Sequence, residues 1–137
     1  YYTVSSFSAL SNSIHTNADI NVVSDITFNG VITISGKTNV KISSSTGRVL
    51  TSDRSFSASS GGMFYVDSGS DVTFTGLRFA SGSAAYGGCL YATGSTIEMD
   101  DVDLTSCYST VRHANKRYRT KPNMHRRHHP THLLAPA

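Results

Sequence analysis

Residues 61–79 read GGMFYVDSGSDVTFTGLRF and residues 87–104 read GGCLYATGSTIEMDDVDL, and the second stretch repeats the pattern of the first. One residue is missing from the second stretch, but glycines, serines and apolar residues recur at matching positions. The period is about 25 residues, and an internal period of this size is typical of stacked repeats. The matching positions pair Gly62 with Gly88, Phe64 with Leu90, Tyr65 with Tyr91, Gly69 with Gly94, Ser70 with Ser95, Val72 with Ile97, Phe74 with Met99, Leu77 with Val102, and Phe79 with Leu104.

The earlier part of the chain contains a weaker copy of this pattern. Residues 31–43, VITISGKTNVKIS, form two short β-rich runs around a glycine-centred turn. The distance to the next copy is longer, which predicts an intervening loop within the serine-rich residues 43–61. In this copy Val40 and Ile42 occupy the positions of Val72 and Phe74, and Val49, Leu50 and Phe56 are apolar residues of the loop that could still fill part of a coil.

Apolar and polar residues alternate within these runs. In Val72-Thr73-Phe74, and again in Ile97-Glu98-Met99, the apolar residues share one face of the expected strand. Glycine, serine, asparagine and aspartate fill the gaps, and no helical period appears between Ile14 and the C-terminal segment. Recurring strands without crossover helices predict a parallel β-helix, an all-β solenoid. A β-sandwich would explain the alternation, but not the return of the glycines at nearly matching positions.

The first residues indicate a short amphipathic helix. Ser5 and Ser6 are candidate N-caps, and Phe7, Leu10 and Ile14 follow at helical spacing. A solenoid must cover its open end, because strand edges and core would otherwise face water. The helix is therefore expected to cap the first coil, although an ordinary surface helix would show the same pattern.

The charge of the 137-residue, single-domain chain is unevenly distributed. Residues 1–110 contain five Lys and Arg and nine Asp and Glu, a net charge of −4. Residues 111–137 contain seven Lys and Arg and no acidic residue, a net charge of +7, with five of the six His and all three Pro. This break predicts a cap over residues 1–19, β-helix repeats over 20–110 and a basic, disordered tail over 111–137.

The basic tail allows several interpretations. The plainest is a solvated, disordered segment. Basic residues around Tyr118 could also bind nucleic acid or another anionic polymer nonspecifically. The abrupt change of composition in mid-repeat is also what a misread frame or an unspliced intron would produce. Four histidines of the tail could ligate a metal ion, but the sequence indicates no folded frame that would hold them together. These residues are His125, His128, His129 and His132.

Two sequence motifs resemble known β-helix families. Phe7-Ser-Ala-Leu10, a short spacer and the run INVVSDITF from Ile20 resemble the opening of many pectate-lyase-like right-handed β-helices. Gly87-Gly88-Cys89-Leu90 resembles the GGA-plus-aliphatic motif of polymorphic outer membrane protein repeats, and Phe79-Ala-Ser-Gly82 resembles their FxxN motif. Cys89 replaces the alanine of the family motif, Gly82 replaces its asparagine, and Gly61-Gly62-Met63-Phe64 keeps only the glycine pair. The resemblance covers roughly residues 5–110 and implies a right-handed parallel β-helix of about three to four coils.

The most acidic part of the repeats is a candidate ligand surface. Strand alternation predicts that Glu98, Asp100 and Asp103 point outward, with Asp101 beside them. Outward carboxylates can bind Ca²⁺ or act in polysaccharide cleavage, but they more often keep an outer face soluble. A rod of this length, about 20 Å at ~4.8 Å per strand, is short for a catalytic groove. No cation accompanies the acids within the repeats, so we expect no catalytic site, no metal site and no cofactor.

Outward polar residues offer two further candidate surfaces. Tyr65 and Tyr91 should stack one coil apart, either as a sugar-binding platform or as a packing ladder beneath a loop. Outward threonines such as Thr33 and Thr73 are typical of ice-binding solenoids, but Lys41, Glu98 and Asp100 interrupt their rows.

The two cysteines, Cys89 and Cys107, are too few for a disulfide framework. Two small buried apolar residues are the favoured interpretation, and a mutual disulfide is the alternative. No run approaches 18 apolar residues, so the sequence predicts no transmembrane helix.

Together these patterns predict a non-enzymatic, extracellular or cell-surface β-helix repeat fragment. We expect it to be adhesin-like and to contact glycans or other cell-surface polymers, with Tyr65, Tyr91, Glu98, Asp100 and Asp103 as candidate contact residues. A truncated remnant of a β-helical polysaccharide lyase or glycoside hydrolase is the alternative.

Overall fold

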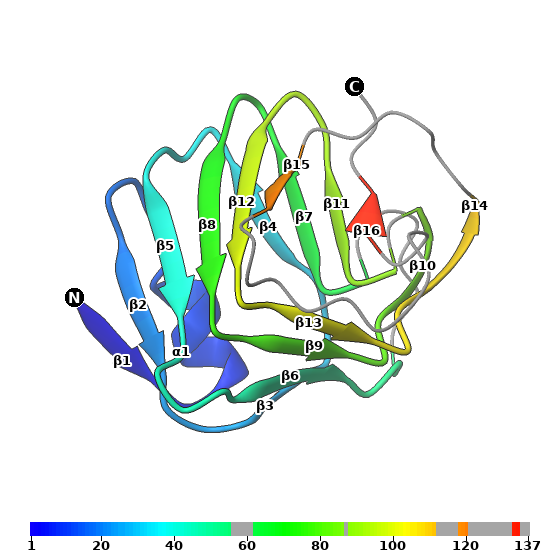
Figure 1. The fold of residues 1–137 in the computed structure, drawn as a ribbon, viewed down its shortest axis with the longest axis horizontal. Helices are drawn as coiled ribbons and strands as arrows, with labels where there is room; N and C mark the ends of the chain where they lie inside the picture. The colour runs from blue at the N-terminus through cyan, green and yellow to red at the C-terminus, as the bar shows by residue number, and fades with distance from the viewer. Residues whose placement is uncertain (56–61, 87, 112–117, 121–132, 135–137) are drawn as a thin grey trace.

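The computed structural model of the chain describes residues 1–55, 62–86, 88–111, 118–120 and 133–134 (Figure 1). Its elements in chain order are β1 (Tyr2–Val4), α1 (Phe7–Asn12), β2 (Asp19–Val22), β3 (Ile26–Phe28), β4 (Ile32–Ser35), β5 (Val40–Ser43), β6 (Val49–Ser52), β7 (Phe64–Asp67), β8 (Asp71–Thr75), β9 (Arg78–Ala80), β10 (Ser83–Tyr86), β11 (Leu90–Ala92), β12 (Thr96–Asp100), β13 (Asp103–Thr105), β14 (Tyr108–Val111), β15 (Tyr118–Thr120) and β16 (Leu133–Leu134).

Every strand pairing within these described residues is parallel. The first sheet has six strands in the order β1-β2-β5-β8-β12-β15. The second has the order β16-β11-β7-β4, the third has the order β13-β9-β6-β3, and β10 pairs with β14. The fold is therefore strand-rich and built from parallel sheets, in agreement with the all-β prediction.

The chain visits its sheets in a recurring order. β2, β3 and β4 belong to the first, third and second sheets, and β5, β6 and β7 repeat that order. In Figure 1, β5, β8 and β12 lie side by side, while β6, β9 and β13 run together along another side of the molecule. Each repeat thus adds one strand beside its equivalent from the repeat before.

The register confirms the internal repeat that the sequence predicts. The two matching stretches pair residue by residue: Phe64 with Leu90, Tyr65 with Tyr91, Val72 with Ile97, Phe74 with Met99, and Phe79 with Leu104. The weaker copy joins the same sheets, with Val40 opposite Val72 and Ile42 opposite Phe74.

The apolar residues of successive repeats share one core. Phe64 lies near its centre, with its ring centroid 5.4 Å from that of Phe28, 5.1 Å from Phe74 and 5.7 Å from Phe79. These four side chains are fully buried and come from strands of all three large sheets. The inward residues of the strands therefore form a continuous core along the stack.

The serine-rich segment differs from the predicted loop. Val49–Ser52 forms β6, which pairs with β3 on one side and β9 on the other. Leu50 is fully buried between Ile26 and Phe79, and this stacking is what makes the short run a strand. Phe56 lies outside the described residues.

The N-terminal helix forms where the sequence predicts it. The hydroxyl of Ser6 accepts a hydrogen bond from the Ala9 amide at 3.1 Å, which identifies Ser6 as the N-cap. Phe7 packs on Phe28 at a ring distance of 5.0 Å, and Leu10 is fully buried. The preceding strand β1, which the sequence pattern does not indicate, pairs with β2 at the edge of the first sheet.

Two segments of the basic tail differ from the expected disorder. β15 pairs with β12, and β16 pairs with β11, so both add strands to sheets that the repeats form. β14 likewise pairs with β10.

Candidate functional site

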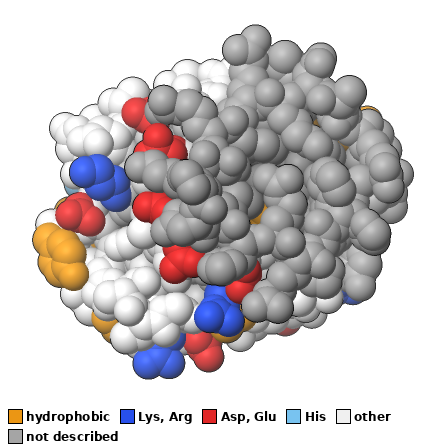
Figure 2. Space-filling view, in the orientation of Figure 1, with side chains coloured by type: hydrophobic (Ala, Val, Ile, Leu, Met, Phe, Trp, Pro, Cys, Tyr) orange, Lys and Arg blue, Asp and Glu red, His pale blue; other side chains and the backbone are white. Residues whose placement is uncertain are grey.

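Glu98, Asp100 and Asp101, which we call the acidic row, lie along β12 and the turn that follows it. Glu98 and Asp100 are half-buried on the outer face, whereas Ile97 and Met99 point inward and are fully buried. The orientation of these carboxylates follows the strand alternation. Figure 2 shows acidic side chains gathered in a column over β8 and β12.

Asp103 lies on the same face as its exposed register partner Arg78, as strand alternation predicts, but its side chain is buried. Its residue is only 6% exposed, and its Oδ2 lies 3.9 Å from a guanidinium nitrogen of Arg78. Arg78 on β9 is the register partner of Asp103 on β13, so the two side chains come from equivalent positions of successive repeats. Strand alternation predicts the face of Asp103, but it does not predict how far neighbouring repeats bury the side chain.

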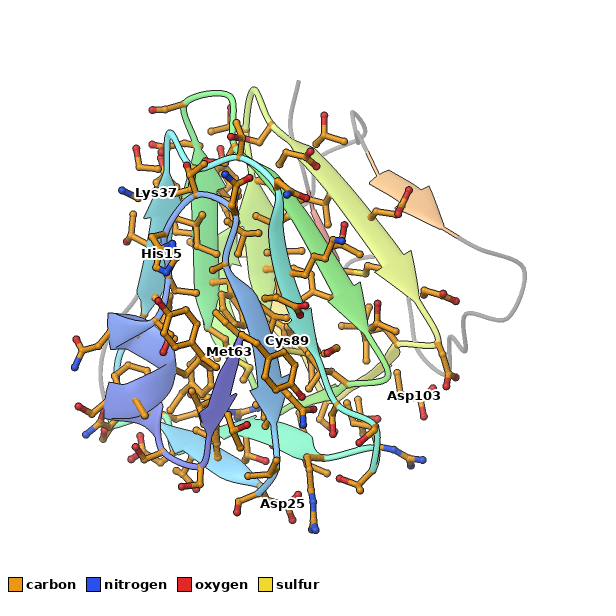
Figure 3. The ribbon with its side chains drawn as sticks, turned by 90° about the vertical axis from the view of Figure 1, so that its left-hand side faces the viewer. His15, Asp25, Lys37, Met63, Cys89 and Asp103 are labelled. Atoms are coloured by element: carbon orange, nitrogen blue, oxygen red, sulfur yellow. A yellow bond between two sulfur atoms is a disulfide. The ribbon has the colours of Figure 1, made fainter. Side chains whose placement is uncertain are left out.

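This pair also corrects the expectation that no cation accompanies the acids within the repeats. The side chain of Arg78 is 57% exposed, so its charge reaches the surface beside a buried carboxylate. Figure 3 shows Asp103 at the margin of the molecule, away from the interior positions of Met63 and Cys89.

The structure divides the predicted acidic residues between two sheets. Glu98 and Asp100 belong to β12 in the first sheet, and Asp103 belongs to β13 in the third. In the described part of the chain, no group of three or more His, Cys, Asp and Glu is placed to hold a metal ion. The four candidate metal-ligating histidines of the tail, His125, His128, His129 and His132, lie outside the described residues.

Tyr65 and Tyr91, which we call the tyrosine stack, lie on the outer face of the second sheet. They are register partners on β7 and β11, and their rings are 5.5 Å apart and inclined by only 3°. Tyr86 meets the ring of Tyr91 at 6.1 Å and 67°. Each ring of the stack therefore has one face covered by the other, and both residues remain half-buried. The stacking that the repeat predicts is present, and this geometry is compatible with either a packing ladder or a sugar-binding platform.

Asp67 adds a carboxylate beside the tyrosine stack. Burial raises the pKa of Tyr65 above its ordinary value of 10.0, and the negative charge of Asp67 and the phenol of Tyr91 act in the same direction. The phenol groups of the stack therefore lie beside a carboxylate on the outer face of the second sheet.

Cys89 and Cys107 form a disulfide with a Cα–Cα distance of 5.3 Å. Both residues are fully buried, as the favoured sequence interpretation predicts, but they are bonded to each other, which that interpretation did not include. Their separation of 18 residues differs from the repeat period, so the pairing is not a simple stacking of equivalent positions. The bond links the residue before β11 to the residue before β14.

Arg54 is a structural residue that the sequence analysis missed. Its Nε donates to the carbonyl oxygen of Ser81 at 2.8 Å, and its Nη2 donates to that of Ser106 at 3.5 Å. All three residues have positive φ, so equivalent turns of three repeats are linked by one side chain. The sequence separations between these three residues, 27 and 25, are close to the repeat period and could have indicated that their turns are equivalent. No pattern of apolar residues draws attention to these positions.

Comparisons with known proteins identify no relative: no family model, no curated protein and no solved structure matches the chain. No helix in the described residues has the length and apolar character needed to cross a membrane.

Proposed function

We propose that the chain is a non-enzymatic β-helix repeat protein that is secreted or located at the cell surface. In this role it is adhesin-like and contacts glycans. The observation that carries this proposal is the tyrosine stack, an aromatic ridge with phenol groups on the outer face of the second sheet. Half-exposed aromatic residues with a polar end suit surfaces that meet partly apolar, partly hydroxylated ligands such as sugars.

We infer that the successive repeats are coils of a right-handed parallel β-helix, each contributing one strand to each of the large sheets. Three features support this inference: parallel pairing, a recurring order of sheets, and equivalent residues opposite each other. The right hand follows from the strong preference of parallel connections for right-handed crossovers. This fold, with the GGCL motif at Gly87, is the basis of the resemblance to pectate-lyase-like proteins and polymorphic outer membrane protein repeats.

The tyrosine stack supports a particular mode of glycan contact. One face of each ring is already covered, so a sugar would meet the remaining ring surface, the phenol of Tyr65 and the row continued by Thr33, the register partner of Tyr65 on β4. Contacts of this kind are individually weak, and repetition along a surface gives them useful avidity.

The disulfide supports a location outside the cytosol. Disulfides form and persist in oxidising compartments, and a fully buried bond between Cys89 and Cys107 is of the structural kind. A location at the cell surface or in the extracellular space accords with an adhesin-like role.

The alternative is a remnant of a β-helical polysaccharide-active enzyme. The Arg78–Asp103 pair favours it, because it places a cation beside a carboxylate on an outer face. The two groups are, however, directed at each other at 3.9 Å, and the other acids lie on a different sheet. If the remnant were active, reducing ends would appear in polygalacturonate or another acidic polysaccharide, and Arg78→Ala would abolish their release.

A glycan array probed with the full chain, with and without Ca²⁺, tests the proposed contact. We expect binding by the wild-type protein, weaker binding by Tyr65→Phe and a larger loss for Tyr65→Ala. Tyr1→Ala is the matched control, because Tyr1 is 79% exposed and lies outside the stack. Circular dichroism confirms that each variant is folded. Absence of binding by the folded wild-type protein contradicts the proposal, and binding that Tyr65→Ala leaves unchanged contradicts the proposed site.

A further inference from the structure

The outer face of the second sheet carries two rows of polar and aromatic side chains. The first row consists of Thr33, Tyr65 and Tyr91, which are register partners on β4, β7 and β11. The second row lies two residues further along the strands, where Ser35 is the register partner of Asp67. Residues two apart in a strand share a face of the sheet. Asp67 therefore lies on the same side as the tyrosine stack.

Asp67 places a negative charge beside the stack. Burial raises the pKa of Tyr65, and the charge of the Asp67 carboxylate, which therefore lies near the phenol, raises it further. The carboxylate Oδ1 of Asp67 is buried, and no donor among the described residues forms a hydrogen bond with it. The ion pair of the described residues joins Arg78 to Asp103 on the third sheet and does not involve Asp67. A ligand that brings a cation would therefore balance a charge that the described residues leave unbalanced.

The tyrosine rings favour the same kind of ligand. The face of an aromatic ring has a negative potential, which attracts a cation, and it also packs against apolar surface. The rings of Tyr65 and Tyr91 lie nearly parallel, with centroids 5.5 Å apart. Thr33 and Ser35 are exposed beside them, and their hydroxyl groups can donate and accept hydrogen bonds. The surface thus combines a carboxylate, aromatic rings and hydroxyl groups.

We propose that the tyrosine stack and Asp67 bind an amino sugar, whose ammonium group pairs with the Asp67 carboxylate while its apolar ring face lies against the tyrosine rings. This inference rests on the proposed glycan contact and names the class of sugar that takes part in it. An N-acetylated sugar can use the rings but brings no positive charge, and an acidic sugar is repelled by Asp67. A lysine-rich peptide brings the cation but offers neither the rigid ring face nor the row of hydroxyl groups.

Isothermal titration calorimetry of the full chain with two sugars tests the inference. The probes are a β-1,4-linked glucosamine tetramer and its fully N-acetylated form, at a slightly acidic pH where the free amines are protonated. We expect the wild-type protein to bind the glucosamine tetramer about three- to tenfold more tightly, because a partly exposed charge-assisted contact has about this effect. High salt should reduce the preference. This comparison needs only wild-type protein, so it remains decisive if a variant fails to fold.

Two variants separate the carboxylate from the rings. Asp67→Asn removes the charge at nearly constant size, and it should abolish the preference for the glucosamine tetramer. Tyr65→Ala should weaken binding of both tetramers, because both use the ring. Asp71→Asn is the matched control, since Asp71 is exposed on β8 of the first sheet and loses the same charge. It should leave the preference unchanged, and circular dichroism checks that each variant is folded.

The possible failures can be told apart. Equal affinity for the two tetramers, or a preference that Asp67→Asn leaves intact, overturns the amino-sugar inference, and the glycan contact stands if Tyr65→Ala still weakens binding. A tetralysine peptide that binds as tightly as the glucosamine tetramer also overturns the inference, because the site then responds to charge alone. If neither tetramer binds but the glycan array shows another sugar, only the amino-sugar inference is wrong. If the array shows no binding, the proposed function fails with it.

Discussion

Gly62 shows how closely the backbones of successive repeats approach each other. A Cβ at this position would collide with the carbonyl oxygen of Gly88 and would lie 2.6 Å from the amide nitrogen of Ser83. Both neighbours are backbone atoms that cannot rotate away. Glycine at position 62 therefore reflects a close approach of the main chain to that of Gly88 in the next repeat.

We expect Gly62→Ala to lower the free energy of unfolding by about 3 kcal/mol, because overpacking forces a backbone shift. Gly30→Ala is the matched control, since a Cβ there meets only the end of the Phe7 ring at an ordinary 3.7 Å. Urea denaturation followed by circular dichroism measures both. Equal stability of the two variants would contradict the close approach.

The raised pKa of Tyr65 makes the stability of the protein depend on alkaline pH. Burial favours the neutral phenol in the folded state, as does the Asp67 carboxylate, so the folded pKa exceeds the unfolded value. The contribution of Tyr65 to the free energy of unfolding is therefore fully present below pH 10, and it is lost as the pH rises through the pKa of the folded state. Wild-type protein should therefore lose more stability than Tyr65→Phe above pH 10, in urea denaturation at a series of pH values. If the free energies of unfolding of the two proteins decline in parallel above pH 10, the pKa of Tyr65 is not raised in the folded state.

At the scale of elements, α1 depends on its surroundings. A helix of six residues is too short to be stable alone, so its cap and its packing must hold it. Phe7 and Leu10 provide the packing, and Ser6 provides the cap. The helix covers apolar residues of the first repeat, which is the role the sequence predicts for a cap.

Replacing the cap serine tests this dependence. Ser6→Ala should cost about 1 kcal/mol of stability, because the Ala9 amide loses its acceptor. Ser5→Ala, an exposed neighbour outside the helix, should change stability by less than about 0.5 kcal/mol. Thermal unfolding of the two variants distinguishes them, and a larger effect for Ser5→Ala would mean that the cap is assigned to the wrong serine.

The strands were predictable from sequence to the extent that they repeat. Alternation identifies β8 and β12, and their equivalence fixes the register between them. The strand β6 was predicted only as apolar residues of a loop that could fill part of a coil, because its burial comes from stacking on Ile26 and Phe79, which lie far away in the sequence. β1 was missed because three residues show no period.

The candidate site was predictable to a smaller extent. The facing positions of Tyr65 and Tyr91 follow from the repeat, and the structure places them so. The burial of Asp103 and its ion pair with Arg78 one repeat away did not follow, because alternation within one strand does not say what neighbouring repeats place beside it. The two-residue period of a strand predicts on which face of the sheet a side chain lies. The side chains that cover it belong to neighbouring repeats, which this period does not identify.

At the scale of the whole molecule, the two ends of the stack are secured differently. At the N-terminal end, α1 packs on β3 and β1 pairs with β2. Toward the other end, the disulfide joins Cys89, before β11, to Cys107, before β14. Repeats contact mainly their neighbours, so a local covalent link matters most for the repeats it joins.

Reduction of the disulfide should therefore loosen the C-terminal repeats selectively. Closing a loop of this size contributes about 3 kcal/mol, so protein refolded under reducing conditions should show a clearly lower urea midpoint. Hydrogen exchange should accelerate in β10 and β11 more than in β2 and β5, because the link lies beside the first pair. The variant Cys89→Ala/Cys107→Ala is the control, since reductant should leave its midpoint unchanged. Uniform acceleration across all four strands would mean that the stack unfolds as a single cooperative unit, and the local role of the bond would then be wrong.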